Sequence, residues 1–333
     1  MSLRFTDSFD HYATANLLQK WTSITTGSDG SVSIGAGGRF GSGMFLGAGF
    51  PYVGWATKIL DAQATWYVGA AFSPFGRIIL YDGATAQLTL ALDGTGRLAV
   101  YQGTTSGTLL GTGTTILSPG WHYVELGATI NNTTGTCEVR LDGVTEWSGS
   151  ALDTQASANA SADRVTLWGQ NGVAVDDLYI CDGAGSAPRN TFLGDVRVQA
   201  LMPSADGDLS QFVPSSGSTH YNLVDEVPPD DDTSYVSSAT AGNVDLYQLG
   251  DVAAVSGSIL GLQVLPYARK DDAGTRTLAP VVKTGGVEYD GSAVALGMSY
   301  TYLPEIWEQN PATSADWTIA DVNALQAGVK VVA

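Results

Sequence analysis

Pairs of carboxylates are the first residues to test for chemistry, because two of them on one strand face can hydrolyse glycosidic bonds. Such a pair lies roughly 5–9 Å apart, with one acid and one nucleophile or base. The nearest sequence patterns are EVRLD at 138–142 and EIWE at 305–308, and both have the wrong spacing for such a strand. Glu138 and Arg140 share a strand face, which suits a surface ion pair. The sequence therefore predicts no glycosidase pair.

Histidine and glycine motifs indicate no other catalysis. The histidines are His11, His122 and His220, and none lies beside a serine on a nucleophile-elbow turn. The segment GAGGRFGSG at 35–43 has a phosphate-loop composition, but the residues after it do not open a helix, so we expect a glycine-rich hairpin. We predict no catalytic residues, no cofactor-binding residues and no enzymatic activity.

Turn aspartates are the candidates for a metal site. They are Asp82, Asp93, Asp142 and Asp153. No D-x-D-x-D-G spacing accompanies them, and an aspartate in a turn already has a structural reason to be there. We expect no cofactor and no metal ligand, with a Ca²⁺ site as the alternative interpretation.

Tryptophans are the candidates for sugar contact, since an exposed aromatic ring beside amide or carboxylate groups can hold a saccharide. Candidates by residue type are Trp55, Trp66, Trp147, Trp168 and Trp307. Most tryptophans of this kind belong to a core. The exception is Trp168, which is followed by Gln170 and Asn171 where a strand leaves for a turn. We predict glycan contact at these three residues.

The composition excludes several classes of partner. The 333 residues are 44% hydrophobic and 14% charged, which favours a folded chain. The net charge is −18, so nucleic acid and anionic membranes are disfavoured as partners. The opening MSLRFTDSFDHY lacks a signal-peptide pattern and no stretch approaches the roughly 20 apolar residues of a membrane span. We expect synthesis in a cytoplasm and no membrane insertion.

Short alternating runs that end in Asp-Gly or glycine-rich turns predict an all-β chain. The predicted strands lie within these segments: 76–83, 86–94, 95–103, 121–130, 136–143, 144–149, 164–169, 173–182, 195–208, 243–250, 257–272, 276–286, 286–291 and 298–307. One short helix is expected after Thr318, with Ile319, Val322 and Leu325 on one face and Gly328 beyond its end.

The two cysteines and the domain boundaries follow from the same pattern. Strand parity places Cys137 and Cys181 on opposite faces, so we expect no disulfide between them. The stretch DGAGSAPRN has no periodicity, so it marks a domain junction. We predict a first domain at 1–184, a linker at 185–194 and a second β-sandwich domain at 195–333.

Three elements of the first domain carry a family resemblance. Residues 121–126 read WHYVEL, residues 141–143 read LDG, and residues 176–179 read DDLY. In this order and spacing, the chain resembles the LamG or concanavalin A-like lectin and glucanase superfamily. The resemblance implies a jelly-roll sandwich and, as in many relatives, Ca²⁺ at its rim. It implies no single function, because lectins, hydrolases and structural proteins share the fold.

The C-terminal segment carries a second resemblance. DWTIADVNALQAG at 316–328 is similar to the ending of tail and fibre-associated proteins of tailed bacteriophages. The expected function is a non-enzymatic structural or adhesive component on the outer surface of a virion: a tail fibre, collar or head decoration with weak glycan binding. Expected partners are other virion proteins, further copies of the chain in a homo-oligomer such as a trimer, and host surface glycans. The alternatives are a free carbohydrate-binding, lectin-like module and, third, a glycoside hydrolase with an unrecognised site.

Overall fold

The computed structural model describes residues 2–25, 31–47, 52–253 and 256–333. The chain forms two compact units, Met1–Val198 and Gln199–Ala333. Strands dominate both units, which confirms the prediction of an all-β chain. None of the described helices is long and apolar enough to cross a membrane.

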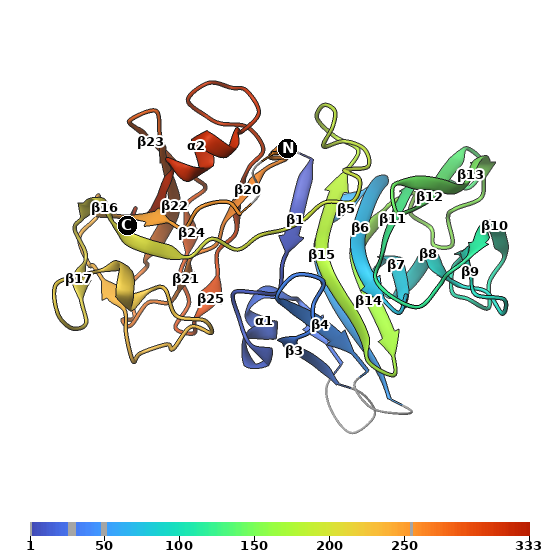
Figure 1. The fold of residues 1–333 in the computed structure, drawn as a ribbon, viewed down its shortest axis with the longest axis horizontal. Helices are drawn as coiled ribbons and strands as arrows, with labels where there is room; N and C mark the ends of the chain where they lie inside the picture. The colour runs from blue at the N-terminus through green and yellow to red at the C-terminus, as the bar shows by residue number, and fades with distance from the viewer. Residues whose placement is uncertain (1, 26–30, 48–51, 254–255) are drawn as a thin grey trace. The chain divides into compact units, whose positions relative to one another are not determined.

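The first unit contains two antiparallel sheets that lie face to face (Figure 1). Sheet A has the order β13-β12-β11-β6-β15-β4-β3, with β1 also paired with β15, and sheet B has the order β10-β9-β8-β7-β14-β5-β2. Sheet A comprises β1 (Leu3–Asp7), β3 (Val32–Ala36), β4 (Ser42–Leu46), β6 (Thr65–Ser73), β11 (His122–Thr129), β12 (Gly135–Leu141), β13 (Val144–Leu152) and β15 (Val173–Asp182). Sheet B comprises β2 (Ser23–Ile24), β5 (Val53–Gln63), β7 (Arg77–Asp82), β8 (Thr85–Leu92), β9 (Arg97–Gln102), β10 (Leu109–Ile116) and β14 (Ala162–Gln170).

Alternation along the strands fills the space between the sheets. Val124 and Leu126 of β11 and Leu80 of β7 are fully buried there, because successive side chains of a strand point to opposite faces. Trp66 of β6 is also fully buried, and its indole N–H donates to the carbonyl oxygen of Ala162 at 3.0 Å. The sandwich core is thus apolar, and the remaining side chains of each strand form two outer faces.

Several sequence expectations about local structure are confirmed. The glycine-rich segment at 35–43 forms the β3–β4 hairpin, in which Val32 is opposite Leu46. Cys137 is opposite Ala128 on the core side of sheet A, whereas Cys181 is opposite Tyr67 on the outer side. The two thiols therefore lie on opposite faces, both are buried, and they form no disulfide.

Two long strands of the first unit were not predicted from the sequence. β5 and β6 run from Val53 to Gln63 and from Thr65 to Ser73. β6 lies between β11 and β15, so five consecutive residues of it are buried and its sequence does not alternate. Both strands lack the Asp-Gly turn that marks the predicted hairpins.

The segment 185–194, predicted as a linker, belongs to the first unit, which extends to Val198. Phe192 in this segment is 9% exposed, and its ring meets Tyr67 edge-on at 5.1 Å between centroids. Residues 195–202, predicted as the start of a strand, form no strand; β16 begins at Pro203. Up to Val198 the chain is instead irregular and is held by backbone hydrogen bonds to Glu125 and Asp177 on the outer face of sheet A.

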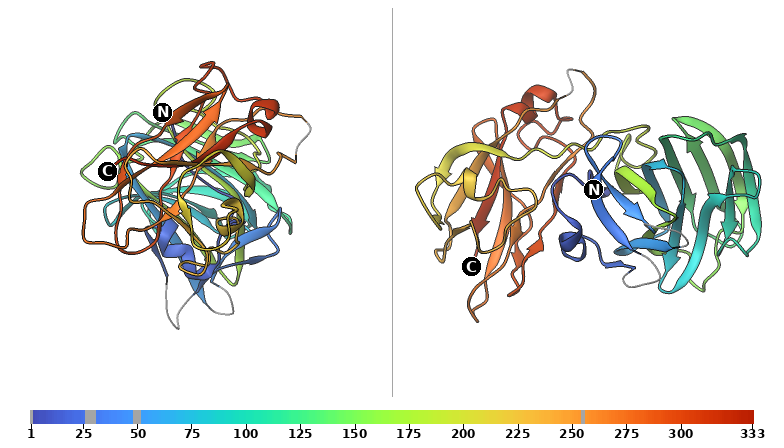
Figure 2. Two further views of the ribbon diagram at one scale, coloured as in Figure 1. Left: turned by 90° about the vertical axis from the view of Figure 1, so that its left-hand side faces the viewer. Right: turned by 60° about the horizontal axis from the view of Figure 1, so that its bottom comes forward.

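The second unit is built on a six-stranded antiparallel sheet with the order β16-β19-β27-β22-β23, in which β24 also pairs with β22. Its strands are β16 (Pro203–Ser210), β19 (Val244–Leu249), β22 (Thr277–Thr284), β23 (Val287–Asp290), β24 (Val294–Ala295) and β27 (Gln326–Val331). Three two-stranded ladders complete it: β17 (Val213–Pro214) with β18 (Val236–Ser237), β20 (Leu262–Val264) with β26 (Glu305–Trp307), and β21 (Tyr267–Ala268) with β25 (Thr301–Tyr302). Figure 2 shows this unit in yellow to red.

The predicted short helix is present as α2 (Ile319–Asn323). Thr318 caps it: its hydroxyl accepts from the Asp321 N–H at 3.1 Å, and the Asp321 carboxylate accepts from the Thr318 N–H at 2.9 Å. Gly328, expected just beyond the helix, lies within β27, where a Cβ atom would collide with the Asp245 backbone. The glycine is required by close packing of β19 against β27, and not by the helix end.

Candidate binding site

The predicted glycan-contact residues lie at the end of β14. Val165 and Leu167, which alternate with Thr166 and Trp168 along β14, are fully buried in the core. Thr166 and Trp168 therefore point to the outer face of sheet B. Gln170 continues this face and is exposed. Asn171 follows in the turn with a φ of 61°, a left-handed conformation that asparagine tolerates.

A second tryptophan and an arginine flank Trp168. Trp55 of β5 and Arg77 of β7 are its direct partners on the two neighbouring strands, so all three share the outer face. The Arg77 guanidinium lies 4.0 Å from the centre of the Trp168 ring, in a cation–π contact. Trp55 is 38% exposed. We call Trp55, Trp168 and Arg77 the Trp–Arg row.

The next row on the same face is made of small polar and apolar side chains. Thr57 of β5 and Thr166 of β14 are opposite each other, and their hydroxyls are 2.8 Å apart. Ile79 of β7 and Thr89 of β8 continue the row. These two rows contain no carboxylate, although the chain as a whole has a net charge of −18.

The other tryptophans on the candidate list have structural roles. Trp66 is fully buried in the core, as described above. Trp147 of β13 lies where Cβ atoms at Gly111 and Gly149 would collide with its ring, so it fills the edge between the two sheets. Trp307 is partly buried and packs against a buried cluster of the second unit that includes Trp317. Among these five tryptophans only Trp55 is exposed, and Trp168, partly buried like Trp147 and Trp307, is distinguished by its pairing with Trp55.

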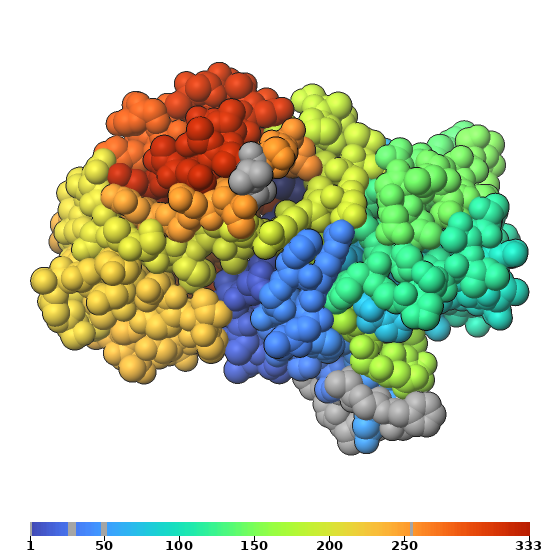
Figure 3. Space-filling view, viewed as in Figure 1, coloured from blue at the N-terminus to red at the C-terminus, as the bar shows by residue number. Residues whose placement is uncertain are grey.

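The outer face of sheet A is different, because residues 189–198 lie across it. The N–H of Gly194 donates to Glu125 of β11 at 2.8 Å, and the N–H of Val198 donates to Asp177 of β15 at 2.8 Å. Arg39, from the β3–β4 turn, forms a bidentate pair with Asp195 at 2.5 and 2.9 Å. In Figure 3 the yellow-green residues of this segment lie at the surface beside the blue residues of the β3–β4 hairpin.

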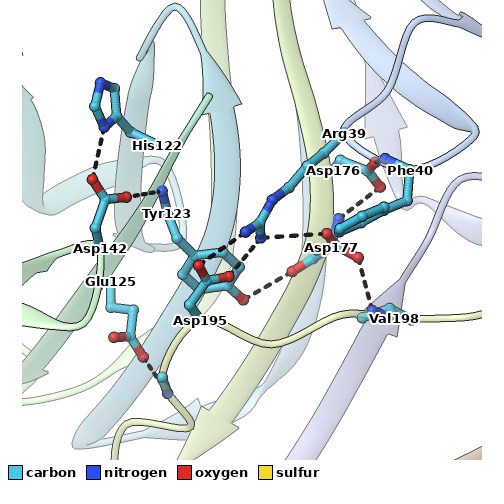
Figure 4. Close-up of polar contacts among 11 residues, drawn as sticks. Arg39, Phe40, His122, Tyr123, Glu125, Asp142, Asp176, Asp177, Asp195 and Val198 are labelled. Carbon is cyan, nitrogen blue, oxygen red and sulfur yellow. Dashed lines mark hydrogen bonds and ion pairs between the residues drawn. The ribbon is translucent and has the colours of Figure 1, made fainter. Parts of the chain in front are cut away.

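Figure 4 shows how the polar groups converge beneath this segment. Arg39 reaches between Asp195 and Asp177, with its guanidinium 3.6 Å from the Asp177 carboxylate. The Tyr179 hydroxyl donates to Glu125 at 2.5 Å, and the Tyr123 hydroxyl donates to the Asp177 carbonyl oxygen at 2.9 Å. The sheet A network is our name for the residues joined by these contacts: Arg39, Tyr123, Glu125, Asp176, Asp177, Tyr179 and Asp195.

Burial sets the protonation of this network. It raises the pKa of Asp177 to about 7 and that of Asp176 to about 6, and it also raises the pKa of Glu125. Oxygens Oδ2 of Asp177 and Oε2 of Glu125 receive no hydrogen bond from the described residues. These acids resemble catalytic groups in their raised pKa values, but backbone N–H groups of the covering segment occupy the other oxygens of Asp177 and Glu125. The oxygens of Asp176 accept from the N–H groups of Phe40 and Asp177. The geometry of Asp177 and Glu125 therefore anchors the segment.

A bulge in β15 builds part of this network, and sequence reasoning missed it. Asp177 has a φ of 53°, and the pairing with β6 shifts register between Asp176 and Tyr179. The extra residue places Asp176 on the same face of sheet A as Tyr179, because their partners Ala71 and Gly69 are two residues apart on β6. The DDLY motif that carried the family resemblance contains this bulge, and the adjacent Asp-Asp pair was the available signal.

A small groove borders the covering segment. Its volume is about 370 Å³, and its lining includes Tyr67, Glu138, Arg140, Ser148 and Phe192. Arg140 pairs with Glu138 at 2.7 Å, as the sequence predicted, and stacks on Phe192 at 4.1 Å. The arginine of this groove is therefore already neutralised by a neighbouring carboxylate.

A serine, a histidine and an aspartate come together at the start of β11. Nε2 of His122 lies 3.0 Å from the Ser118 hydroxyl, and Nδ1 lies 2.8 Å from Asp142. Nε2 is also 3.1 Å from the Ser118 carbonyl oxygen. Asp142 in addition accepts from the Tyr123 N–H at 2.8 Å. These contacts tie the turn at Ser118 and the turn at Asp142 to the start of β11.

The turn aspartates considered for Ca²⁺ bind the chain itself. Asp93 accepts from the backbone N–H groups of Thr95 and Arg97, and Asp142 accepts from that of Tyr123. Asp82 accepts from Ser157 and Asn159, and Asp153 from the N–H of Gln155. Within the described residues no group of three or more acidic, histidine or cysteine side chains is placed to hold a metal ion.

Comparison with known proteins gives likeness in fold only. No family model and no curated protein sequence matches the chain. Similar solved structures include alginate lyase Aly36B (11% identity, 54% of this chain and 96% of the other, TM-score 0.37). Domain 4 of AbnA, a GH43 extracellular arabinanase from Geobacillus stearothermophilus in complex with arabinotriose, is 16% identical over 55% of this chain and 96% of the other, with a TM-score of 0.35. An endo-1,3-beta-glucanase from Streptomyces sioyaensis is 13% identical over 54% and 95%, with a TM-score of 0.35. We transfer no residue role from them.

Proposed function

We propose that this chain is a non-enzymatic, carbohydrate-binding adhesive protein of a bacteriophage virion, and that the Trp–Arg row contacts the carbohydrate. The carrying observation is the cross-strand pair of Trp55 and Trp168 on the outer face of sheet B, with Arg77 stacked on one side. Aromatic rings with a polar rim of this kind provide apolar contact area and fix a ligand by a few hydrogen-bonding groups. The exposed polar side chain beside the rings is Gln170, whereas Thr57 and Thr166 are buried and hydrogen-bond each other.

The distribution of carboxylates supports a binding role over hydrolysis. Hydrolysis requires two acids that face the scissile bond. The two outer rows of sheet B that surround Trp168 carry none, and the buried acids of sheet A accept hydrogen bonds from the segment that covers them. A polysaccharide panel tests this directly. Release of reducing ends by the purified protein, retained after repurification, would overturn the non-enzymatic assignment.

The virion part of the proposal is supported by the ending DWTIADVNALQAG, which resembles phage tail and fibre-associated proteins. Weak binding by one copy is useful on a particle, because many copies add avidity. Immunogold electron microscopy of purified particles tests this part. Labelling of the particle surface is expected. Glycan binding without any labelling would favour the free lectin-like module.

A glycan array with matched variants tests the site. Trp55→Ala and Trp168→Ala should each abolish the array signal of the wild type, because each removes ring contact. Tyr235→Ala is the control, since it removes a similarly exposed aromatic ring, 40% exposed, from the second unit. Loss of signal in all three variants, or no signal for the wild type on a broad array, would overturn the proposed site.

A further inference from the structure

Arg77 is an arginine without an ion-pair partner. Within the described chain no carboxylate lies within ion-pair distance of its guanidinium, and its side chain makes no hydrogen bond; it stacks on the Trp168 ring at 4.0 Å and interacts electrostatically with Tyr81. Three other arginines of the first unit are neutralised by carboxylates: Arg39 by Asp195, Arg140 by Glu138, and Arg164 by Asp163. Like Arg77, Arg97 and Arg197 form no ion pair within the described residues, and Nε of Arg97 is buried without a hydrogen bond. Arg77 differs from both in its place beside Trp55 and Trp168 on the outer face of sheet B.

The position of Arg77 determines which ligand group its guanidinium can bind. Stacking on Trp168 fixes the plane of the guanidinium and leaves its N–H edge free to donate. Partial burial lowers the pKa of Arg77, because the cation loses water without gaining an anion. A planar fork of donors fits a carboxylate or sulfate better than it fits a single hydroxyl.

The surroundings do not repel an anion. Neighbouring outward positions hold Trp55, Thr166, Ile79 and, by the register of β7 with β8, Ala91. The carboxylate of Asp163, at the other end of β14, is occupied by a bidentate contact with Arg164 at 2.9 and 3.1 Å. Among these four neighbouring outward positions Arg77 therefore meets no carboxylate.

We infer that the saccharide bound at the Trp–Arg row is acidic, and that Arg77 donates hydrogen bonds to its carboxylate or sulfate while the tryptophans contact the ring. This inference rests on the proposed function and specifies its substrate class. Arg77 is then the residue that sets specificity between acidic and neutral saccharides.

Matched ligands separate the charge from the sugar. Titration calorimetry would compare trigalacturonate with its methyl ester, and a sulfated carrageenan oligosaccharide with its desulfated form. The acidic member that fits should bind at least about tenfold more tightly than its neutral counterpart, as expected for charge-assisted hydrogen bonds. Raising NaCl should reduce the difference. The pair that shows the difference identifies the anion as carboxylate or sulfate.

Variants separate Arg77 from its neighbours. Arg77→Met should abolish the preference for the acidic ligand and leave the affinity for the neutral one, whereas Arg77→Lys should retain part of it because charge remains but the fork is lost. Arg164→Met is the matched control and should keep the preference. Circular dichroism confirms that each variant is folded before titration.

Three outcomes decide between the two proposals. An equal affinity for acidic and neutral ligands, still dependent on Trp168, would overturn the inference and leave the proposed function standing. Equal loss of both affinities in Arg77→Met would also overturn it, because Arg77 would then only position Trp168. Absence of binding to every oligosaccharide would overturn both.

Discussion

The two outer faces of the first unit differ in what covers them and in the charges that they carry. Sheet A bears Glu125, Asp176 and Asp177, and the segment up to Val198 donates backbone N–H groups to Glu125 and Asp177. Sheet B bears the Trp–Arg row, with a partly exposed tryptophan and an unpaired arginine. On sheet A, buried carboxylates hold the covering segment by hydrogen bonds. On sheet B, Arg77 has no ion pair within the described residues and the Trp55 ring is partly exposed.

This difference teaches where function is to be sought in such a sandwich. Raised carboxylate pKa values are often a mark of catalytic sites, but structural networks perturb pKa values as well. The acids of sheet A have such values because they are buried by their own chain. An arginine without an ion pair beside a partly exposed tryptophan is the better guide here, and both lie on sheet B.

The largest expected effect is on the covered face. Phe192→Ala should lower the free energy of unfolding by about 3 kcal/mol, because it removes a buried ring from Tyr67 and Arg140. Urea denaturation measures the change. Val144→Ala is the control at an exposed position of sheet A, 66% exposed, and should change stability by less than about 0.5 kcal/mol. A loss below about 1 kcal/mol in Phe192→Ala would show that the segment is only loosely attached.

The pH dependence of the covered face gives an intermediate effect. The pKa of Asp177 is raised to about 7 in the folded chain, above its unfolded value of 3.8, so the folded state holds this proton more tightly. Stability from this group is full below about pH 4 and falls as pH rises toward 7. Asp177→Asn removes this loss. Its stability relative to the wild type should therefore improve between pH 5 and pH 8, on the order of 2 kcal/mol.

The comparison between variant and wild type matters because His11 titrates in the opposite sense. Burial lowers the pKa of His11 to about 3, so its contribution to stability rises with pH between 3 and 6.5. This contribution cancels in the difference between the two proteins. A difference that stays constant from pH 5 to pH 8 in chemical denaturation would show that Asp177 ionises normally.

The smallest expected effect on stability is at the Trp–Arg row on the outer face of sheet B. Trp55→Ala should change the free energy of unfolding by less than about 1 kcal/mol, because the ring is 38% exposed at its place on β5. The same variant should lose glycan binding. Thermal denaturation beside the binding assay checks both. A large loss of stability would make Trp55 a core residue and erase the contrast between the two faces.

The sequence predicted the strands that alternate and end in Asp-Gly turns, and it predicted the capped helix after Thr318. It did not predict β5 and β6, because burial on both faces removes alternation from β6, and neither strand ends in a marked turn. Trp168 was predicted because it stands at a strand exit. Its partners Trp55 and Arg77 come from strands distant in sequence, and only the register of the sheet brings them together.

The covering segment was hidden for a similar reason. The junction was placed at DGAGSAPRN, residues 182–190, because Gly, Ala, Ser and Pro dominate this stretch, a composition typical of linkers. Phe192 and the backbone N–H of Gly194 attach the segment to sheet A, and backbone donors leave no trace in the sequence. Long-range pairing therefore accounts for most of what sequence reasoning missed in the site.

Hydroxyl-radical footprinting with the acidic oligosaccharide that binds in calorimetry tests the contrast between the faces most directly, because it reads aromatic side chains on both in one experiment. The ligand should protect Trp55 and Trp168 from oxidation and leave Tyr67, Phe192 and Tyr235 unchanged. Protection of Tyr67 and Phe192 in place of the two tryptophans would move the binding site to the groove on sheet A and contradict the account.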